Sequence, residues 1–540
     1  MAAIFRVELS ATADEPGAVV LAWTDPENRG GEELIGAETV RRLQESSLAF
    51  MRERSGSKRW VELAWKLYDV LNTGACELER FHGSGRPPLE LRIRADGNTR
   101  VWPFELIRMI FDIRIIREID TDCSCSVSDL NVLEDRMLLL MFMACAPQYP
   151  GDESSEGQLY FEKEEEAIFE ATKSGAVELD VEDTGSLNGL AEKLREEKFD
   201  VVHISCHANI DEGGPYLCME TDVGELHKAS PEALWENCLK LRPPHIVFLS
   251  ACRSGESGGH EASSSFCESL VARGLPMAIG WGISVADPNA TRASQIFYGE
   301  LALGVTALEA VEHTREKLIS EGDLFWPFLR VFVSPEVTDF AIVSPPGGRK
   351  RLPKRRTTKL KQLGDAGMNV LLEGFVGRRR EIQKGLRALR DTETAGIFIH
   401  GAGGLGKSCL AGRLVERFSE RNLIVVNGVL NEETFTSALL KGFNRAKNLA
   451  GIRMLKDKGV ELADKIPVFC STEFSEASYI ILLDDFERNI VVEYGEIKGI
   501  TEGAGSVLDP LIENLPECLG VTKLIITSRY RLPLEEFEYI

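Results

Sequence analysis

Histidine and cysteine side chains cluster in the stretch VVHISCHANI, where His203, Cys206 and His207 lie within five positions. A second stretch, PHIVFLSACRSG, carries Cys252 among small residues. A free thiol is only partly ionised at neutral pH, and a histidine within reach removes its proton and later protonates the leaving group. The two stretches therefore predict nucleophilic catalysis, with Cys252 as the nucleophile and His207 as its base.

Zinc binding is the competing hypothesis for the first stretch. A structural zinc site needs four ligands and usually cysteines paired at short spacing. The nearest further candidates, Cys218 and His227, do not follow that pattern. We expect His203 to be a structural residue of a buried strand and Cys206 to be its buried neighbour.

A third stretch, GAGGLGKS at 401–408, matches the phosphate-binding pattern G-x-x-x-x-G-K-[ST] in full. It follows the apolar run AGIFIH and precedes the helical sequence CLAGRLVERFSER, which is the strand, loop and helix context of a P-loop. Glycines let such a loop curl so that backbone N–H groups face a phosphate. The predicted nucleotide-binding residues of this loop are Gly401, Gly403, Gly404, Gly406, Lys407 and Ser408.

Two later apolar stretches complete this predicted site. YIILLDDFERN (479–489) ends in Asp484, which we expect to hold Mg²⁺ together with Ser408, and in Asp485, which is placed to polarise an attacking water. TKLIITSRYR (522–531) brings Arg529 toward a γ-phosphate. The expected cofactors are ATP or ADP with Mg²⁺, and Lys407 would reach the β- and γ-phosphates.

These motifs, in this order, resemble the nucleotide-binding core of the STAND or AP-ATPase class of signal-transduction ATPases. FVGRRREIQKGLRAL (375–389) resembles the segment that this class places before its P-loop. The resemblance covers about residues 371–540. We do not find the winged-helix lid and the repeat-built sensor of the class in the sequence.

Short apolar runs typical of buried strands alternate with helical stretches before the glycine-rich loop. Continuous apolar strands separated by helices indicate an α/β fold, with a mostly parallel sheet covered by helices on both faces. The same alternation resumes at 395, which predicts a second α/β domain of the P-loop NTPase type. The predicted strands are 90–97, 136–147, 199–208, 244–255 and 275–282, and the predicted helices include 162–175, 186–198 and 291–304.

The placement of the reactive residues depends on which strands are neighbours. Parallel sheets put their sites at the carboxyl ends of adjacent strands. His207 and Cys252 therefore emerge side by side if the strands at 199–208 and 244–255 are adjacent.

Composition narrows the function classes. The chain has 540 residues and a net charge of −23, which argues against a nucleic-acid binder as a whole, because attraction to phosphate needs a basic face. Its start has no basic segment followed by an apolar core, and no apolar stretch reaches the roughly 18 residues that span a bilayer. The 12 cysteines are scattered, which favours free thiols in a reducing compartment. We expect a cytoplasmic protein with no nucleic-acid or membrane partner.

A basic run, SPPGGRKRLPKRRTTKLK at 344–361, separates the two patterns. It carries eight Lys or Arg residues and no acid, which is typical of a solvated linker. The predicted organisation is a first domain at 1–343, a linker at 344–370 and a second domain at 371–540.

The first domain resembles the CHAT domain, a caspase-like cysteine protease fold related to separase. That family has a strand ending in His-Gly and then a strand ending in Cys with small neighbours, which VVHISCHA and VFLSACRSG match. WPFELIRM (102–109) resembles its early segment, 297–318 its helix after the active strands, and FWPFLRVFV (325–333) its closing strand. The resemblance covers about residues 60–340, preceded by an N-terminal extension to about residue 60.

The CHAT resemblance implies roles for three residues and leaves a fourth open. It makes His207 the base and Cys252 the nucleophile, and it forms the oxyanion hole from the backbone N–H groups of Ala208 and Cys252. Ala208 stands where the family has glycine, so it adopts a positive φ less readily. In GWGISVADPNAT (280–291), Asp287 either lines an S1 pocket for a basic P1 side chain (the residue before the cut bond) or caps the helix that follows.

Together the two resemblances imply a nucleotide-gated cysteine endopeptidase, in which a STAND ATPase controls a CHAT protease acting on a protein or peptide substrate. They also imply a nucleotide-dependent homo-oligomer and a role in prokaryotic immune or programmed-cell-death signalling. The alternative is a catalytically dead caspase-like binding module on a regulatory signalling ATPase; an ATPase-controlled transcription regulator comes third. If P1 is basic, the linker offers the chain's own cleavage sites at Arg351, Arg355 and Arg356.

Overall fold

The computed structural model of the chain divides into two compact units. The N-terminal unit comprises Met1–Thr221 and Leu226–Pro353, and the C-terminal unit comprises Asp222–Glu225 and Lys354–Ile540. The structure describes residues 3–53, 57–72, 77–81, 89–121, 136–147, 161–172, 177–252, 262–283, 285, 287–345, 360–363, 368–371, 378–494, 496–518 and 521–540.

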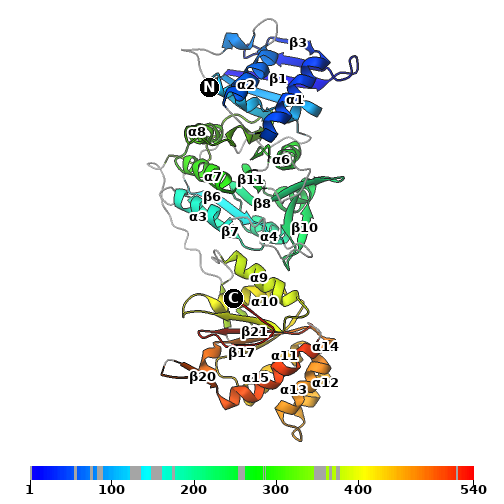
Figure 1. Cartoon of the computed structure of the whole chain (residues 1–540), viewed down its shortest axis with the longest axis vertical. Coiled ribbons are helices and arrows are strands. Elements are labelled where there is room, and N and C mark those ends of the chain that lie inside the picture. Colours follow the sequence, from blue (N-terminus) through cyan, green and yellow to red (C-terminus); the bar gives the residue numbers. More distant parts are fainter. Residues whose placement is uncertain are drawn as a thin grey trace. The chain divides into compact units, whose positions relative to one another are not determined.

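The N-terminal unit is built on one large sheet (Figure 1). Its strands are β1 (Ala3–Ala11), β2 (Val19–Thr24), β3 (Gly30–Ile35), β4 (Leu89–Ala95), β5 (Ile113–Glu118), β6 (Leu138–Ala144), β7 (Val177–Glu182), β8 (Val201–Asp211), β9 (Gly214–Glu220), β10 (Leu226–Ala229), β11 (Ile246–Cys252), β12 (Met277–Trp281) and β13 (Leu329–Val333). Its helices are α1 (Ala37–Glu53), α2 (Ser57–Asn72), α3 (Phe161–Thr172), α4 (Leu187–Glu196), α5 (Pro231–Leu234), α6 (Ala262–Ala272), α7 (Asp287–Ala302) and α8 (Ala307–Ser320).

The strand order is β10-β9-β8-β11-β12-β13-β5-β4-β1-β2-β3, and β6 joins β8 on the side away from β11, with β7 beyond it. Strands β7, β6, β8, β11 and β12 run parallel, whereas β13 is antiparallel to β12. The large, mostly parallel sheet flanked by helices confirms the fold class predicted for this part of the chain.

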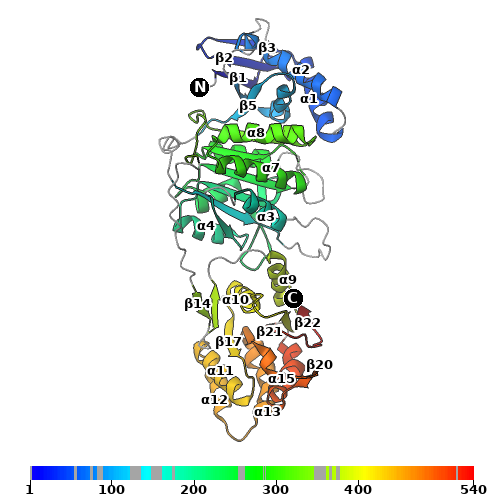
Figure 2. The same ribbon diagram turned by 90° about the vertical axis from the view of Figure 1, so that its left-hand side faces the viewer.

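The central strands are buried on both faces, which explains their unbroken apolar sequences. One set of alternating residues, including Val202, Ile204 and Leu249, packs with side chains of α4 and α6. The other set, including Phe248 and Ile279, packs with α7 and α8. Helices α3, α7 and α8 lie along this second face (Figure 2). Positions on β8 therefore alternate between two different environments.

The first strands of the chain belong to the same sheet. Strand β1 pairs in parallel with β4, and β2 and β3 extend the edge as an antiparallel meander. The sequence patterns did not predict these strands within the expected extension to about residue 60. Their burial alternates residue by residue in β1, with Phe5, Val7 and Leu9 inside, because one face of this edge is less covered.

The helix predicted over 297–318 is interrupted. Helix α7 ends at Ala302 and α8 begins at Ala307. Gly304, between them, has φ +82°, a left-handed conformation that favours glycine. A Cβ at this position would also lie 2.8 Å from the backbone N of Pro345, so a larger residue would not fit.

The C-terminal unit has a five-stranded sheet in the order β17-β18-β21-β16-β22, with every neighbouring pair parallel. Its strands are β16 (Gly396–His400), β17 (Asn422–Asn427), β18 (Tyr479–Asp484), β21 (Lys523–Ser528) and β22 (Phe537–Tyr539), and two separate hairpins are formed by β14 (Leu360–Leu363) with β15 (Met368–Leu371) and β19 (Ile490–Glu493) with β20 (Glu496–Ile500). Its helices are α9 (Arg379–Arg390), α10 (Lys407–Arg417), α11 (Glu432–Arg445), α12 (Leu449–Lys456), α13 (Leu462–Ser471), α14 (Glu473–Glu476) and α15 (Glu502–Asn514).

Helices cover both faces of this second sheet (Figure 1). Side chains of α9 and α10, such as Leu386 and Leu414, pack on one face with Ile397 and Ile525. Helices α11, α13 and α15 cover the other face. The hairpin β14–β15 begins inside the segment predicted as a linker, 344–370, and ends one residue beyond it. Of the basic run at 344–361, residues 346–359 lie outside the described residues.

Candidate functional site

The carboxyl ends of β8 and β11 bring the predicted nucleophile and base into register. The two strands are parallel neighbours, and the Cα partner of Cys252 is His207. Neighbouring strands lie about 4.7–4.9 Å apart, so the two backbones are as close as adjacent strands allow. The adjacency assumed from the sequence is therefore present at these two positions.

His207 lies where β8 changes its partner. Up to Ser205 the strand pairs with β6, and from His207 onward it forms a hairpin with β9, with Cys218 as the Cα partner of His207. The His207 side chain is buried but retains 6% of its surface. Strand β6 ends before His207, so the residue beside His207 on that side of β8 is Cys218 of β9.

Cys206 has the environment of a core residue rather than of a nucleophile. It is fully buried on the face that packs with α4 and α6. Burial raises the pKa of the Cys206 thiol well above its ordinary value, and the nearby Cys218 adds to the rise. A thiol with a raised pKa is a poor source of thiolate at neutral pH. The interpretation of Cys206 as a buried neighbour fits this environment.

Ala208, the predicted oxyanion-hole residue, has an ordinary strand backbone. It pairs with Leu217 of β9 and does not have a positive φ. The glycine that the CHAT pattern has at this position is therefore not required by the backbone conformation here. Alanine supplies the same N–H group as glycine would.

Asp287 is the first residue of α7 and is partly buried. A carboxylate in the first turn of a helix stabilises it through the helix dipole. This position suits the capping role, and it is compatible with the S1 role as well, because the helix follows directly on the segment after β12. The two hypotheses for Asp287 therefore both stand.

A buried polar cluster that the sequence analysis did not predict lies two residues before the His207–Cys252 pair. Glu164 of α3 accepts hydrogen bonds from Ser205 Oγ (2.8 Å) and Ser250 Oγ (2.7 Å), which are themselves Cα partners on β8 and β11. Ser294 Oγ of α7 lies 2.9 Å from the same carboxylate. The only hint in the sequence is that Glu164 falls on the buried stripe of α3 with Phe161 and Ile168.

His203 completes this cluster. Its Nε2 lies 3.4 Å from Glu164 Oε1, and its Nδ1 is 2.9 Å from the hydroxyl of Tyr298. The imidazole is stacked between the rings of Phe142 and Phe248. Burial by itself raises the pKa of Glu164, but the imidazole and the serine hydroxyls outweigh burial, so the pKa lies below its ordinary value. The carboxylate is thus held ionised inside the protein.

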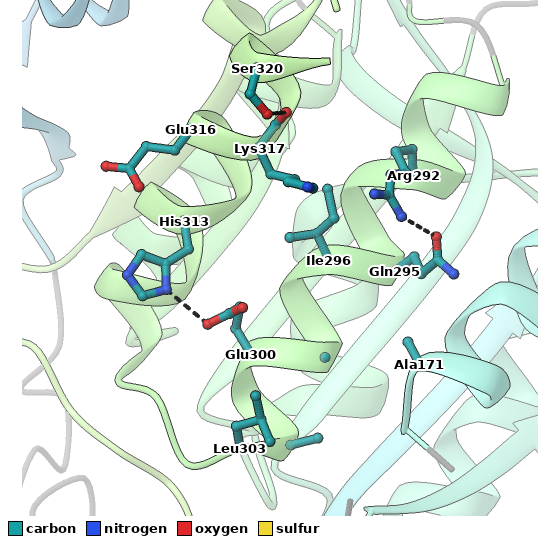
Figure 3. Close-up of a pocket in the computed structure, with 12 residues that line it drawn as sticks. Ala171, Arg292, Gln295, Ile296, Glu300, Leu303, His313, Glu316, Lys317 and Ser320 are labelled. Atoms are coloured by element: carbon teal, nitrogen blue, oxygen red, sulfur yellow. Dashed lines mark hydrogen bonds and ion pairs between the residues drawn. The ribbon is translucent and has the colours of Figure 1, made fainter. Parts of the chain in front are cut away.

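A pocket of about 610 Å³ lies between α7 and α8, beside the end of α3 (Figure 3). It is lined by apolar and charged side chains, and His313 Nδ1 lies 2.8 Å from Glu300 Oε2 on its wall. None of the predicted site residues lines it. The pocket therefore belongs to the helical face of the unit and not to the strand ends that carry His207 and Cys252.

The glycine-rich loop of the C-terminal unit joins β16 to α10. Gly404 and Gly406 both have φ +81°, and a Cβ at either would meet nothing within 4 Å, so backbone conformation rather than space requires glycine there. Gly401 also has a positive φ, of 150°. Lys407 Nζ donates to the carbonyl oxygens of Gly401 (3.0 Å) and Ala402 (3.1 Å), which turns the ammonium back across the loop.

Asp484, at the end of β18, is the centre of the second part of this site. Its Oδ1 accepts hydrogen bonds from Ser408 Oγ (2.8 Å) and Thr527 Oγ1 (2.6 Å). Thr527 was not among the predicted site residues, although it lies in the same stretch as Arg529. The structure therefore brings Ser408 and Asp484 together, as Mg²⁺ ligation would need.

Asp485 and Arg529 lie at the rim of this arrangement. Asp485 has φ 55°, and burial together with the neighbouring Asp484 raises its pKa. Arg529 Nε donates to Glu487 Oε1 at 2.8 Å, and a Cβ at Gly403 would lie 3.3 Å from the Arg529 guanidinium carbon. Arg529 thus lies against the loop that was predicted to hold phosphate.

The residues present suit a nucleotide with Mg²⁺. A hydroxyl and a carboxylate are the hard oxygen ligands that Mg²⁺ takes, and an ammonium beside a glycine-rich loop complements phosphate charge. For the zinc hypothesis, no group of three or more His, Cys, Asp and Glu residues that would hold a metal is found in the part of the chain that the structure describes. In that same part, no helix is long and apolar enough to cross a membrane. None of the eight cysteines whose side chains are described is in a disulfide bond.

Comparison with known proteins points to one family for part of the N-terminal unit. Residues 150–328 match the family model of the CHAT domain. A search of the curated proteins found no match. Among solved structures, the chain is similar to the Arg-specific cysteine proteinase gingipain R, with 12% identity over 54% of this chain and 70% of that chain and a TM-score of 0.33.

Two further solved structures show similarity at the same level. One is the complex of the pro- and mature domains of RgpB from Porphyromonas gingivalis, with 12% identity, coverage of 55% of this chain and 77% of that chain, and a TM-score of 0.30. The other is the separase–securin complex of Saccharomyces cerevisiae, with 10% identity, coverage of 61% of this chain and 30% of that chain, and a TM-score of 0.36. Identities this low transfer no residue roles, so none of the roles proposed below rests on these structures.

Proposed function

We propose that the chain is a cysteine endopeptidase with Cys252 as nucleophile and His207 as general base. The observation that carries the proposal is the register of β8 and β11, which makes these two residues Cα partners at the carboxyl ends of adjacent parallel strands. The match of residues 150–328 to the CHAT domain supports it independently of that register.

The proposed reaction has two stages. His207 takes the proton of the Cys252 thiol as the sulfur attacks the carbonyl carbon of the peptide bond, and it then gives that proton to the departing amine. The C–N bond breaks and a thioester remains, which water hydrolyses with His207 again acting as base. The backbone N–H groups of Ala208 and Cys252 would stabilise the negative oxygen of each tetrahedral intermediate.

The ordinary strand backbone of Ala208 bears on the rival hypothesis of a catalytically dead binding module. The sequence argument for that rival was that alanine replaces a glycine at the oxyanion hole. Since Ala208 does not have a positive φ, alanine fits this backbone without strain. We therefore favour an active peptidase.

Peptide cleavage tests the proposal directly. A peptide library is incubated with the full chain and with Cys252→Ala, and new termini are identified by mass spectrometry. We expect cleavage that disappears in Cys252→Ala, whereas equal cleavage by both proteins would exclude Cys252 as the nucleophile. If neither protein cleaves, a thiol-reactive peptide probe that also fails to label Cys252 would favour the binding module.

We further propose that the C-terminal unit binds ATP or ADP with Mg²⁺ and controls the peptidase. Lys407 and the loop glycines would hold the phosphates, and Ser408 and Asp484 would hold the metal. The 2.8 Å hydrogen bond from Ser408 Oγ to Asp484 Oδ1 supports this assignment, because it places the two expected ligand oxygens side by side. Bound Mg²⁺ would supply the positive charge that makes phosphoryl transfer or tight nucleotide binding feasible.

Gating would make peptide cleavage depend on the nucleotide. We expect the cleavage rate of the wild type to change on addition of ATP with Mg²⁺, and that of Lys407→Ala to stay constant. Identical rates with ATP, ADP and no nucleotide in the wild type would contradict gating while leaving the peptidase assignment intact. Nucleotide-dependent assembly of copies and the role in prokaryotic immune or death signalling remain predictions from the family resemblance.

A further inference from the structure

We propose that Glu164 is a positioning residue for the His207–Cys252 pair, because its carboxylate ties together the two strand ends and the helix that carry the proposed site. The inference rests on the proposed peptidase function. It assigns a role to a buried side chain of α3 that lies far from the site in the sequence.

Glu164 accepts hydrogen bonds from both strands at positions two residues before the reacting residues. Ser205 and Ser250 are Cα partners, and both donate to Glu164, at 2.8 and 2.7 Å. His207 and Cys252 are the Cα partners two residues further along each strand, so they lie on the same face of the sheet as the two serines. Two residues of a strand span roughly 7 Å. A shift of one strand against the other would break one of these hydrogen bonds.

The third element is α7. Ser294 Oγ lies 2.9 Å from Glu164 Oε1, and Tyr298, one turn later, contacts His203, whose other ring nitrogen faces the same carboxylate. Helix α7 begins at Asp287, the candidate for P1 recognition. A single carboxylate is therefore bonded to the three elements that carry the base, the nucleophile and the candidate specificity acid.

A carboxylate is the group that this arrangement needs. An ionised carboxylate only accepts hydrogen bonds and offers about four lone-pair sites, and here three hydroxyls and one imidazole nitrogen surround it. A glutamine of the same shape keeps one acceptor oxygen and replaces the other by an NH2 group, which cannot accept a hydrogen bond, so at least one of the serine hydroxyls loses its acceptor. The competing explanation is that Glu164 only stabilises the core, which predicts lower stability with no change in the chemistry of Cys252.

The alkylation of Cys252 by iodoacetamide separates the two explanations. The full chain is treated between pH 5 and pH 10, and modification of the peptide containing Cys252 is followed by mass spectrometry. Variants are Glu164→Gln, Ser250→Ala and His207→Ala, with Glu165→Gln as a control that makes the same change at the adjacent position of the same helix.

For Glu164→Gln we expect the alkylation rate at pH 7 to fall roughly tenfold or more, as for the loss of a hydrogen bond to a charged group, and the pH midpoint to move upward. Ser250→Ala should show a smaller change in the same direction, and Glu165→Gln none. Because both act through one contact, the double variant Glu164→Gln/Ser250→Ala should be no slower than Glu164→Gln alone. Loss of stability alone does not move the midpoint while a variant stays folded, so the unfolding temperature of each variant is measured at every pH used.

The outcomes distinguish this inference from the proposed function. If His207→Ala changes the pH midpoint but Glu164→Gln and Ser250→Ala leave it as in the wild type, the positioning role is refuted and the peptidase stands. If the wild type and His207→Ala share the midpoint of an ordinary thiol, the peptidase proposal is refuted and this inference with it. Should Glu164→Gln not fold, Ser205→Ala and Ser250→Ala decide, and unchanged midpoints in both overturn the inference.

Discussion

Adjacent glutamates of α3 should respond in opposite ways to the same substitution. Glu165 is buried, and among the described residues its Oε1 has no hydrogen-bond partner. Burial, with a contribution from the charge of Glu162, raises the pKa of Glu165 from 4.5 to about 7. The neutral form of Glu165 is therefore preferred in the folded protein below about pH 7, whereas Glu164 is held ionised in its cluster of hydroxyls.

The expected magnitude for Glu165 follows from linkage between protonation and folding. A raised pKa in the folded state means that the stability associated with the protonated side chain is fully present below about pH 4.5 and is lost as the pH rises through about 7. The difference between the two pKa values corresponds to roughly 3 kcal/mol. Glutamine is neutral at every pH, so it keeps the stability that the ionised glutamate loses. Glu165→Gln should therefore be more stable than the wild type by up to roughly 3 kcal/mol at pH 8 and about equally stable at pH 4.5.

The sign is reversed for Glu164. Its pKa is lowered in the folded state, so its contribution is present above about pH 4.5 and is lost as the pH falls further. Removing one partner of a buried charged network costs roughly 3–5 kcal/mol. Glu164→Gln should therefore be less stable than the wild type at neutral pH, with a gap that narrows in acid.

Calorimetry of the full chain at pH 3, 4.5, 6 and 8 measures both effects as shifts of the unfolding transition of the N-terminal unit, with the narrowing for Glu164→Gln expected below pH 4.5. The two variants share helix, residue type and substitution, so helix propensity cancels between them. If Glu165→Gln is destabilised at pH 8, or if its difference from the wild type is the same at every pH, the reasoning about its buried neutral state is wrong.

The other predictions concern the two candidate sites. His207→Ala should lower kcat for peptide cleavage by roughly 10²–10⁴, the usual contribution of a positioned acid–base group, and an unchanged kcat would exclude it as the base. Lys407→Ala should lose ATP and ADP binding by calorimetry while the N-terminal unit still unfolds at its normal temperature; unchanged affinity would contradict the phosphate assignment. Added chelator should not affect peptide cleavage in the absence of nucleotide, and a chelator-sensitive protein would revive the zinc hypothesis. Incubation with ATP should produce cuts within 349–356 that are absent in Cys252→Ala and shifted in Asp287→Ala, whereas an intact linker beside efficient cleavage of acidic peptides would refute a basic P1 preference.

The strands that carry the proposed reactive residues could be predicted from the sequence, as could the residues at the ends of these strands. Unbroken apolar runs ending in polar residues predicted β8, β11, β16, β18 and β21, because strands buried on both faces leave a continuous apolar signal. Strands β1, β2 and β3, which form one end of the sheet, were missed, because strands with one face less covered alternate polar and apolar residues and include charged positions such as Glu8 and Glu32.

Glu164 could not have been found by spacing. Its partners Ser205, Ser250 and Ser294 are separated from it by 41, 86 and 130 positions and follow no common period. Serine and glutamate are ordinary surface residues in any local window. Only the packing of α3 and α7 against the sheet turns them into one cluster, and that packing is a property of the whole unit.

The order of the strands in each sheet decides which of the motifs lie close together. This order differs between the two units. In the N-terminal unit β8 and β11 are direct neighbours, so a residue from each strand end can form a reacting pair. In the C-terminal unit β21 lies between β16 and β18, so the glycine-rich loop and Asp484 are one strand apart, and the end of β21 fills the space with Thr527 and Arg529. The proposed nucleotide and metal site would draw on the ends of three strands, whereas the proposed proton transfer needs only two side chains from direct neighbours. The strand order of each sheet is thus compatible with the function proposed for that unit, and a different neighbour of β8 would separate His207 from Cys252.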